Sequence, residues 1–417
     1  MIDADWFVGI DWASATHEVC ILDRVGDVSE RRQVEHTATG LQTFVEALQA
    51  RASGDLSRVA IAIETPRGAL VEVLVERGCA VYAINPKQLD RFRDRFTAAG
   101  AKDDRRDALV LGASLRTDPQ AFRRVRLDHP VVIQVREWSR MDEALGIELT
   151  RLANQVRELV YRIAPGLLTV CPGADEPWLW ALVRLAPTPA QQHRLSVRRL
   201  ERLLREHQVR RLTAADLRAV LQHPPIATAP GVVDAVAAHL QLLLPRVELV
   251  AQQRRQCGRE LERLLSALAT EAPAPGDQRE HPDVTILRSM PGVGVRVAAR
   301  VLAEASQPLV DRAYHTLRAV MGIAPVTKQS GRSRTVSMRY ACNGRLRDAA
   351  YHWARVGTQR DAKSRAYYAT LRARGHSHAR ALRSVADRLL RVLMSLLARG
   401  QCFDPTYGAP LAATPEA

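Results

Sequence analysis

The chain has 417 residues, 47% of them hydrophobic, which is enough for two or three hydrophobic cores. Its six cysteines form no Cys-x-x-Cys pair and no short spacing with histidine, which argues against a disulfide framework and against a zinc site. The acidic start Met1–Asp5 does not resemble a signal peptide, and no apolar run reaches the roughly 18 residues of a membrane span. We therefore expect a cytoplasmic protein with no membrane partner.

The charge balance favours a nucleic-acid partner. Lysine and arginine total 60 against 45 acidic residues, a net charge of +15 that attracts phosphate in a salt-dependent way. Between Asp311 and Arg347 the chain holds eight basic residues and one acid. The alternative is an ordinary solvated surface rich in arginine.

The first 90 residues alternate between strand and helix patterns. Strands are predicted over 6–11, 17–22 and 31–35, a helix over 40–51, and a strand over 58–63. A helix from Pro66 to Val75 and a strand over 80–84 follow. The order β-β-β-α-β-α-β, then helices, matches the ribonuclease H-like fold, in which the first and fourth strands lie side by side and parallel.

Carboxylates stand at the ends of these elements. Asp11 ends the first strand and Glu64 ends the fourth, so the fold would make them neighbours. A following amphipathic helix carries Asp104 and Asp107 on one face, at i and i+3, although Asp103 and Asp107 at i and i+4 share a face as well. Clustered carboxylates are most stable when they bind a hard cation such as Mg²⁺. Two such ions can stabilise both oxygens of a phosphoryl transfer.

The middle of the chain is predicted to be helical. Two seams with heptad spacing run over 135–163 and 233–268, and Pro245 should kink or split the second helix. The seams can pair within one chain or between chains. Thr213 to Asp216 resembles a capping box, and the Pro- and Gly-rich stretch 271–282 is the best candidate for a domain linker.

The last third contains two candidate DNA-binding features. Met290–Gly294 separates two helical patterns and looks like a helix-hairpin-helix element, in which Gly292 and Gly294 let backbone N–H groups approach a phosphate; an ordinary tight turn is the alternative. Ser330 precedes Gly331 in a basic segment. A serine there is most often a turn residue, but a positioned serine can also be a nucleophile. His376 and His378 more simply begin a final helix over 379–398 than bind metal.

Several motifs resemble one known family. They are Gly9-Ile10-Asp11, Ile63-Glu64-Thr65, Asn85-Pro86, Lys102-x-Asp104-x-x-Asp107-Ala108, Ser289–Gly294, Gly322–Pro325, Ser330-Gly331 and Asn343-Gly344-x-Leu346-Arg347. In this order they resemble the Asp-Glu-Asp-Asp (DEDD) transposases of the insertion-sequence IS110 family, which share a RuvC-like domain with the Piv-type DNA invertases. This chain departs from the family pattern at Asp103, where the family usually has Thr or Ser.

The resemblance implies a site-specific DNA recombinase. Asp11, Glu64, Asp104 and Asp107 would hold Mg²⁺ or Mn²⁺, and Ser330 would be the nucleophile. The implied partners are donor and target DNA and a structured bridge RNA, and the implied assembly is a dimer or tetramer whose active site can be shared between subunits. The nucleic-acid contacts predicted from the basic and glycine residues are Gly292, Gly294, Lys328, Arg332, Arg334 and Arg339.

The predicted organisation has four parts. A RuvC-like α/β domain spans 1–127, a helical coiled-coil region 128–280, a mainly helical C-terminal transposase domain 281–400, and a loose tail 401–417. We expect the protein to be bacterial and nucleoid-associated. Two other functions fit the residues: a RuvC-like junction nuclease that uses water, and a non-catalytic nucleic-acid-binding protein.

Overall fold

The computed structural model describes residues 2–66, 68–93, 103–126, 128–270, 282–331 and 333–405. The chain divides into two compact units, Met1–His129 and Pro130–Ala417, and each is described by itself. The further division of the second unit at residue 280 stays a prediction.

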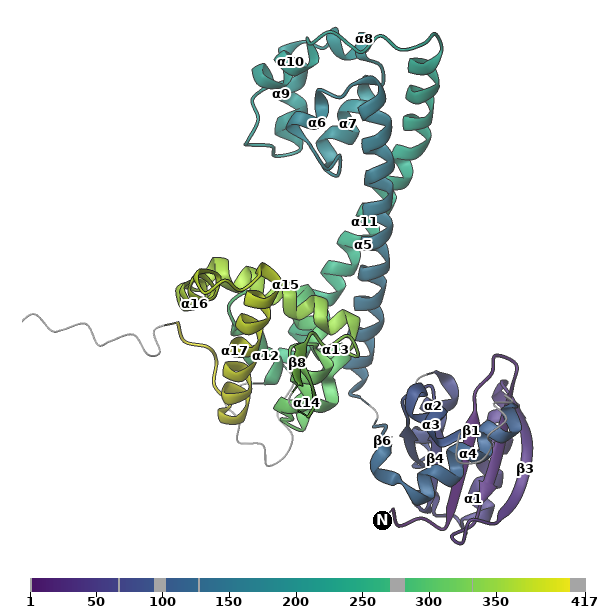
Figure 1. Cartoon of the computed structure of the whole chain (residues 1–417). Helices are drawn as coiled ribbons and strands as arrows, with labels where there is room; N and C mark the ends of the chain where they lie inside the picture. Colours follow the sequence, from purple (N-terminus) through teal and green to yellow (C-terminus); the bar gives the residue numbers. More distant parts are fainter. Residues whose placement is uncertain are drawn as a thin grey trace, which may run out of the picture. The chain divides into compact units, whose positions relative to one another are not determined.

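The first unit is built on one mixed sheet (Figure 1). Its strands are β1 (Trp6–Asp11), β2 (Thr16–Leu22), β3 (Val28–Glu35), β4 (Val59–Ile63), β5 (Ala80–Ala83) and β6 (Arg123–Arg124), in the order β3-β2-β1-β4-β5-β6. Its helices are α1 (Ala38–Arg51), α2 (Ala69–Glu76), α3 (Pro86–Arg93) and α4 (Asp104–Thr117), and short 3₁₀ turns span Leu56–Arg58 and Pro119–Ala121. The predicted order of strands and helices is confirmed, and β1 and β4 are parallel neighbours.

The sheet has an apolar layer on each face. All five residues of β4 are buried, as expected for a central strand that is covered on both sides. Val8, Ile10 and Ile61 pack with residues of α1 and α2, whereas Phe7 and Ala62 pack with residues of α4. The residues of β1 therefore alternate between the two layers, and the odd-numbered ones face α4.

Two details of the first unit differ from the prediction. The helix expected from Pro66 begins at Ala69, because Gly68 at its N-cap has a positive φ of 101°, outside the helical region. The short strand β6 was not predicted, since it consists of two exposed arginines and shows no apolar alternation.

The second unit contains two long helices that pack on each other, α5 (Pro130–Ile163) and α11 (Val232–Thr270). The two predicted seams therefore pair within one chain. Between them lie α6 (Leu167–Val170), α7 (Pro177–Leu185), α8 (Pro189–His193), α9 (Val197–Glu206) and α10 (Ala214–Leu221), gathered at one end of the long pair (Figure 1). The capping box at Thr213 and Asp216 is confirmed. Helix α11 continues through Pro245, so the prediction that this proline splits the helix is wrong.

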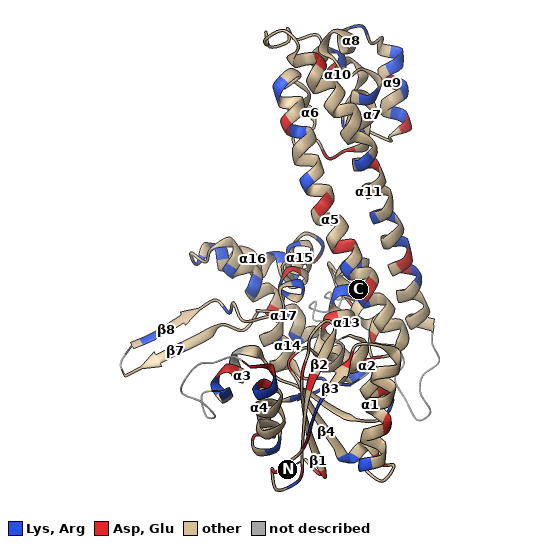
Figure 2. Ribbon diagram, turned by 90° about the vertical axis from the view of Figure 1, so that its right-hand side faces the viewer, with Lys and Arg blue, Asp and Glu red and all other residues tan. Residues whose placement is uncertain are grey.

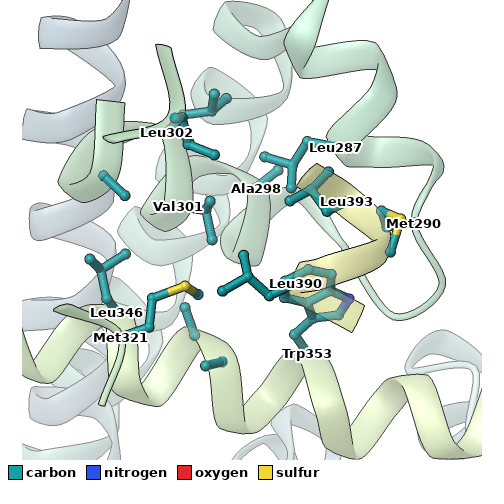
Figure 3. Close-up of a cluster of buried hydrophobic side chains, with 14 of the residues drawn as sticks. Leu287, Met290, Ala298, Val301, Leu302, Met321, Leu346, Trp353, Leu390 and Leu393 are labelled. Carbon is teal, nitrogen blue, oxygen red and sulfur yellow. The ribbon is translucent and has the colours of Figure 1, made fainter. Parts of the chain in front are cut away.

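The C-terminal part of this unit surrounds a separate core. Its elements are α12 (Asp283–Ser289), α13 (Val295–Val310), α14 (Tyr314–Val320), β7 (Val326–Ser330), β8 (Ser333–Ser337), α15 (Gly344–Arg360), α16 (Ala362–Ala373) and α17 (His378–Arg399). Figure 3 shows Trp353 among Leu390, Leu393 and Met290, all of them buried. Ser377 caps α17, so the histidines beside it begin a helix as expected. In the described part of the chain, no helix is both long and apolar enough to cross a membrane.

Candidate active site

Two of the predicted carboxylates lie at adjacent strand ends. In the parallel pair of β1 and β4, Gly9 is opposite Ala62 and Ile10 is opposite Ile63, so Asp11 and Glu64 follow at the same level. Both continue the series of side chains that faces α4, and both are half-buried. The backbone therefore places these two residues next to each other, as predicted.

Helix α4 reaches this edge because small residues let it approach the sheet. A Cβ on Gly9 would overlap the carbonyl oxygen of Ala108, and a Cβ on Gly112 would lie 3.0 Å from the Gly9 nitrogen and 3.5 Å from the Phe7 oxygen. The helix thus runs antiparallel to β1. Four helical residues rise about 6 Å and two strand residues about 7 Å, so Asp104 lies at roughly the level of Asp11.

The start of α4 distinguishes Asp103 from Asp104. Asp103 is the N-cap, with an extended backbone, and its carboxylate accepts a hydrogen bond from the Arg105 backbone nitrogen at 3.2 Å. Asp104 is the first helical residue and is exposed. The pairing of Asp104 with Asp107 is therefore favoured over the pairing of Asp103 with Asp107, since Asp103 already has a capping function.

Asp107 is buried and held by an arginine. Its two oxygens accept bonds from Arg93 Nε at 2.7 Å and Nη2 at 2.8 Å, with only 3% of the Asp107 side chain exposed. Arg93 also pairs with Asp90. In this state the arginine supplies the positive charge that a buried carboxylate requires.

The donor set suits a hard cation, but the side chains do not form a ready-made site. Within the described ranges, no three His, Cys, Asp or Glu side chains form a group that could hold a metal ion. All four predicted donors are carboxylates on elements that meet at one sheet edge, which is the chemistry that Mg²⁺ requires. Their predicted convergence on one point would require Arg93 to release Asp107, and their metal role stays a prediction.

The structure adds one carboxylate that the sequence analysis missed. Glu18 on β2 lies directly opposite Asp11 in the antiparallel pair of β1 and β2, on the face toward α4. Its side chain is 16% exposed, and Arg105 Nε lies 3.9 Å from its carboxylate. Pairing the first two predicted strands residue by residue, starting from the turn between them, could have identified Glu18 as the neighbour of Asp11.

Ser330 ends a strand in a two-stranded ribbon. It pairs with Ser333 across a connection of two residues. Gly331, the first residue of this connection, has a positive φ of 54°, which glycine adopts readily. Figure 2 shows this ribbon projecting from the helices around it, and nearly all of its residues are exposed. In the part of the chain that the structure describes, no side chain hydrogen-bonds the Ser330 hydroxyl, and its role as a nucleophile stays a prediction.

The ribbon presents different cations on its two faces. Lys328 and Ser330 lie two residues apart and share one face, together with Thr335 and Ser333. Arg334 lies opposite Gln329 on the other face. Lys328 is therefore the described cation of the ribbon that shares a face with the serine, while Arg332 lies outside the described residues.

Part of the positive charge counted along this segment is neutralised. Arg312 pairs with Asp283, Arg318 with Asp387, Arg345 with Glu143, and Arg347 lies 3.8 Å from Asp348. The count of eight basic residues and one acid therefore overstates the positive charge that is free around Ser330. Lys328, Arg334 and Arg339 remain without a carboxylate within 4.0 Å among the described residues, and Arg339 Nε donates to the Ala324 oxygen at 3.3 Å.

The predicted helix-hairpin-helix turn has a packing function. Gly292 has a positive φ of 87°, and a Cβ there would lie 2.5 Å from the Gly357 nitrogen of α15. The Trp353 indole donates to the Pro291 oxygen at 3.0 Å. Gly294 precedes α13 and is exposed. Contact with phosphate stays a prediction for both glycines, but Gly292 is required by packing alone.

Comparisons with known proteins agree with this arrangement. The family model of IS110-type DEDD transposases, described as "Transposase", matches residues 8–165, and the model described as "Transposase IS116/IS110/IS902 family" matches residues 284–369. These matches cover the unit with the carboxylates and the segment with the ribbon. The class of protein they define is a transposase, an enzyme that cuts and rejoins DNA.

Relatives extend the similarity over the whole chain. The chain is 32% identical to the mini-circle transposase for IS117 of Streptomyces coelicolor, over 95% of both chains. It is 28% identical to the IS110 43.6 kDa protein of the same species, over 96% of both. It is 44% identical to y4uE of Sinorhizobium fredii, named as a transposase, over 50% of this chain and 58% of that protein. The chain belongs to the IS110 family of transposases.

Proposed function

We propose that the protein is a site-specific recombinase in which Ser330 attacks DNA with the help of a carboxylate-bound divalent metal. The observation that carries this proposal is the exposed ribbon of β7 and β8, which presents Ser330 and Lys328 on one face. A two-stranded ribbon is narrow enough to enter the major groove of DNA. Ser330, beside the turn of this ribbon, would then lie close to the DNA backbone at the edge of the groove.

The attack would proceed by transesterification. The Ser330 oxygen bonds to phosphorus, the bond from phosphorus to the 3′-oxygen breaks, and the serine proton leaves while the 3′-oxygen gains one. The products are a phosphoserine link to the 5′ end and a free 3′-hydroxyl. Lys328 would hold the scissile phosphate and stabilise its developing charge.

The carboxylates of the first unit would supply the activation that the ribbon lacks. Asp11, Glu64, Asp104 and Asp107 would hold Mg²⁺, or Mn²⁺ in its place, and DEDD transposases typically use divalent metal ions. Bound metal would stabilise an alkoxide and the charge on phosphorus. Arg93 would hold the Asp107 side chain in place until metal binds.

The partners follow from the family. Donor and target DNA are the substrates of a transposase, and we propose a structured bridge RNA as the guide, carried by family resemblance. We also propose a dimer or tetramer, because the serine and the carboxylates belong to different units of the chain and can come from different subunits. Such a protein would act in the bacterial cytoplasm, close to the nucleoid.

Hydrolysis by a RuvC-like site is the competing function, since water could attack while the ribbon only binds DNA. Incubating the wild-type protein with Mg²⁺, guide RNA and cognate DNA should give a protein-linked strand that survives denaturation. Asp11→Asn should give neither this adduct nor free cut DNA. Free 5′-phosphate ends without any adduct would establish hydrolysis instead.

A further inference from the structure

A cavity of about 410 Å³ opens at the base of the ribbon. It is lined by Arg318, Arg339, Arg380 and Arg383, and by a single acid, Asp387. These residues come from α14, from the segment that follows β8 and from the first turns of α17. Positive charge from three segments far apart in the sequence is thus collected in one hollow.

The single acid in this cavity is already paired. Asp387 accepts bonds from Arg318 Nε at 2.6 Å and Nη2 at 3.0 Å, and from the Tyr314 hydroxyl at 2.8 Å. For Arg380 and Arg383, the described part of the chain offers no carboxylate within 4.0 Å. Three arginines therefore keep an excess of positive charge in a concave site, where it is screened less than on an open surface.

A second observation concerns His376, which lines the same cavity. Its Nδ1 atom is buried and has no hydrogen-bond partner within the described residues. This atom is covered by protein, so His376 contributes to the wall of the cavity and the arginines supply its hydrogen-bond donors. Arginine forks match the oxygens of a phosphate.

We propose that this cavity binds one backbone phosphate of the nucleic acid that Ser330 cuts, at a fixed spacing from the scissile phosphate. Val336 and Ser337 of β8 line the cavity, and Ser333 pairs with Ser330. Four strand residues from Ser337 to Ser333 span about 14 Å. Since consecutive phosphates of one B-DNA strand are about 7 Å apart through space, the bound phosphate lies about two nucleotides from the cut. The spacing rests on the proposed role of Ser330, whereas the phosphate site itself does not.

The test is the salt dependence of binding, measured by fluorescence anisotropy with a labelled DNA duplex over a range of KCl concentrations. Each phosphate contact contributes a slope of about −0.9 to log K against log[KCl]. The double variant R380Q/R383Q should weaken binding several-fold and make the slope shallower by about one. Arg360 and Arg374, exposed arginines of the same unit outside the cavity, provide the control R360Q/R374Q, which should keep the wild-type slope.

Two further measurements separate phosphate binding from a folding defect and DNA from RNA. R380K/R383K retains the charge and should restore the slope, which separates phosphate binding from a folding defect. Repeating the titration with a structured RNA distinguishes the two sources of phosphate: a slope change on RNA alone assigns the cavity to RNA and overturns its place beside the cut. An unchanged slope on both, or an equal change in the control, overturns the phosphate site.

The spacing is tested by chemistry on the DNA. A neutral methylphosphonate placed about two nucleotides from the cut should weaken wild-type binding but have little added effect on R380Q/R383Q. Equal losses in both proteins would contradict the spacing. Because binding is measured without cleavage, the cavity result stands even if Ser330 proves not to be the nucleophile.

Discussion

The carbonyl oxygen of Ala108 on α4 occupies the place that a Cβ of Gly9 on β1 would need. This backbone contact sets both the distance of α4 from the sheet and its level along β1. Because Asp11 lies two residues beyond Gly9, and Asp104 and Asp107 just before Ala108, the contact also sets how closely the carboxylates approach.

Replacing Gly9 by alanine should therefore lower stability and activity together. The added methyl must push α4 outward in a packed core, at a cost of about 1–3 kcal/mol. We expect a lower melting temperature and little strand cleavage. Gly344 begins α15 with nothing within 4 Å of an added Cβ, so Gly344→Ala should leave the melting temperature unchanged or slightly raised. Wild-type stability and cleavage in Gly9→Ala would contradict the proposed role of the contact.

Asp103 and Asp104 should respond differently to the same substitution. Asparagine caps helices as well as aspartate does, so Asp103→Asn should preserve α4 and retain cleavage. Asp104→Asn removes a proposed metal ligand and should abolish cleavage without changing the melting temperature. Cleavage assays on the two variants decide the register, and the opposite pattern would move the metal ligand to Asp103.

Glu304 on α13 links three helices and makes stability depend on pH. Burial would raise the pKa of its carboxyl, but hydrogen bonds from Arg140 and Asn343 outweigh burial and lower the pKa below the usual 4.5. A lowered pKa in the folded state gives stability that is present above pH 4.5 and is lost as the pH falls through the folded value.

Glu304→Gln should thus destabilise the second unit by about 1–3 kcal/mol at pH 7, because it removes a buried charged partner of Arg140. The difference from wild type should shrink below about pH 4.5. Urea unfolding at several pH values measures this difference. A gap that stays constant down to pH 3 would show that the carboxylate charge is not responsible.

An exposed apolar face of α11 provides a test of self-association. Leu242 and Leu249 are 80% and 53% exposed, and their spacing of seven residues places them on one face of the helix. If this face mediates the proposed dimer or tetramer, Leu242→Glu should lower the mass seen by light scattering while the melting temperature of the chain is kept. Gln155→Glu, an exposed change on α5 and so outside this face of α11, serves as the control. An unchanged mass in Leu242→Glu would remove this face from the assembly.

The sequence was sufficient for the elements that bury apolar side chains. The periodicity of the sequence predicts strands β1 to β5 and both long helices. The resulting strand order predicts that Asp11 and Glu64 lie next to each other. The ribbon of β7 and β8 was not predicted, because its exposed polar residues give no apolar alternation.

Contacts between residues distant in the sequence were also beyond prediction. The pairs of Arg93 with Asp107, and of Arg318 with Asp387, join residues 14 and 69 positions apart. Such pairs depend on the packing of whole helices. A count of charges along the chain therefore cannot tell which carboxylates and which arginines are already paired.

The central claim is that Ser330 itself becomes linked to DNA, and the identity of the linked peptide tests it directly. Trypsin cleaves after Lys328, Arg332 and Arg334, so Ser330 falls in the peptide Gln329–Arg332, and its neighbour Ser333 falls in Ser333–Arg334. Mass spectrometry of the nuclease-trimmed adduct should find the nucleotide mass on Gln329–Arg332. Ser330→Ala should give no adduct, and Ser333→Ala should still give one. A nucleotide on any other peptide, or an undiminished adduct from Ser330→Ala, would contradict the account.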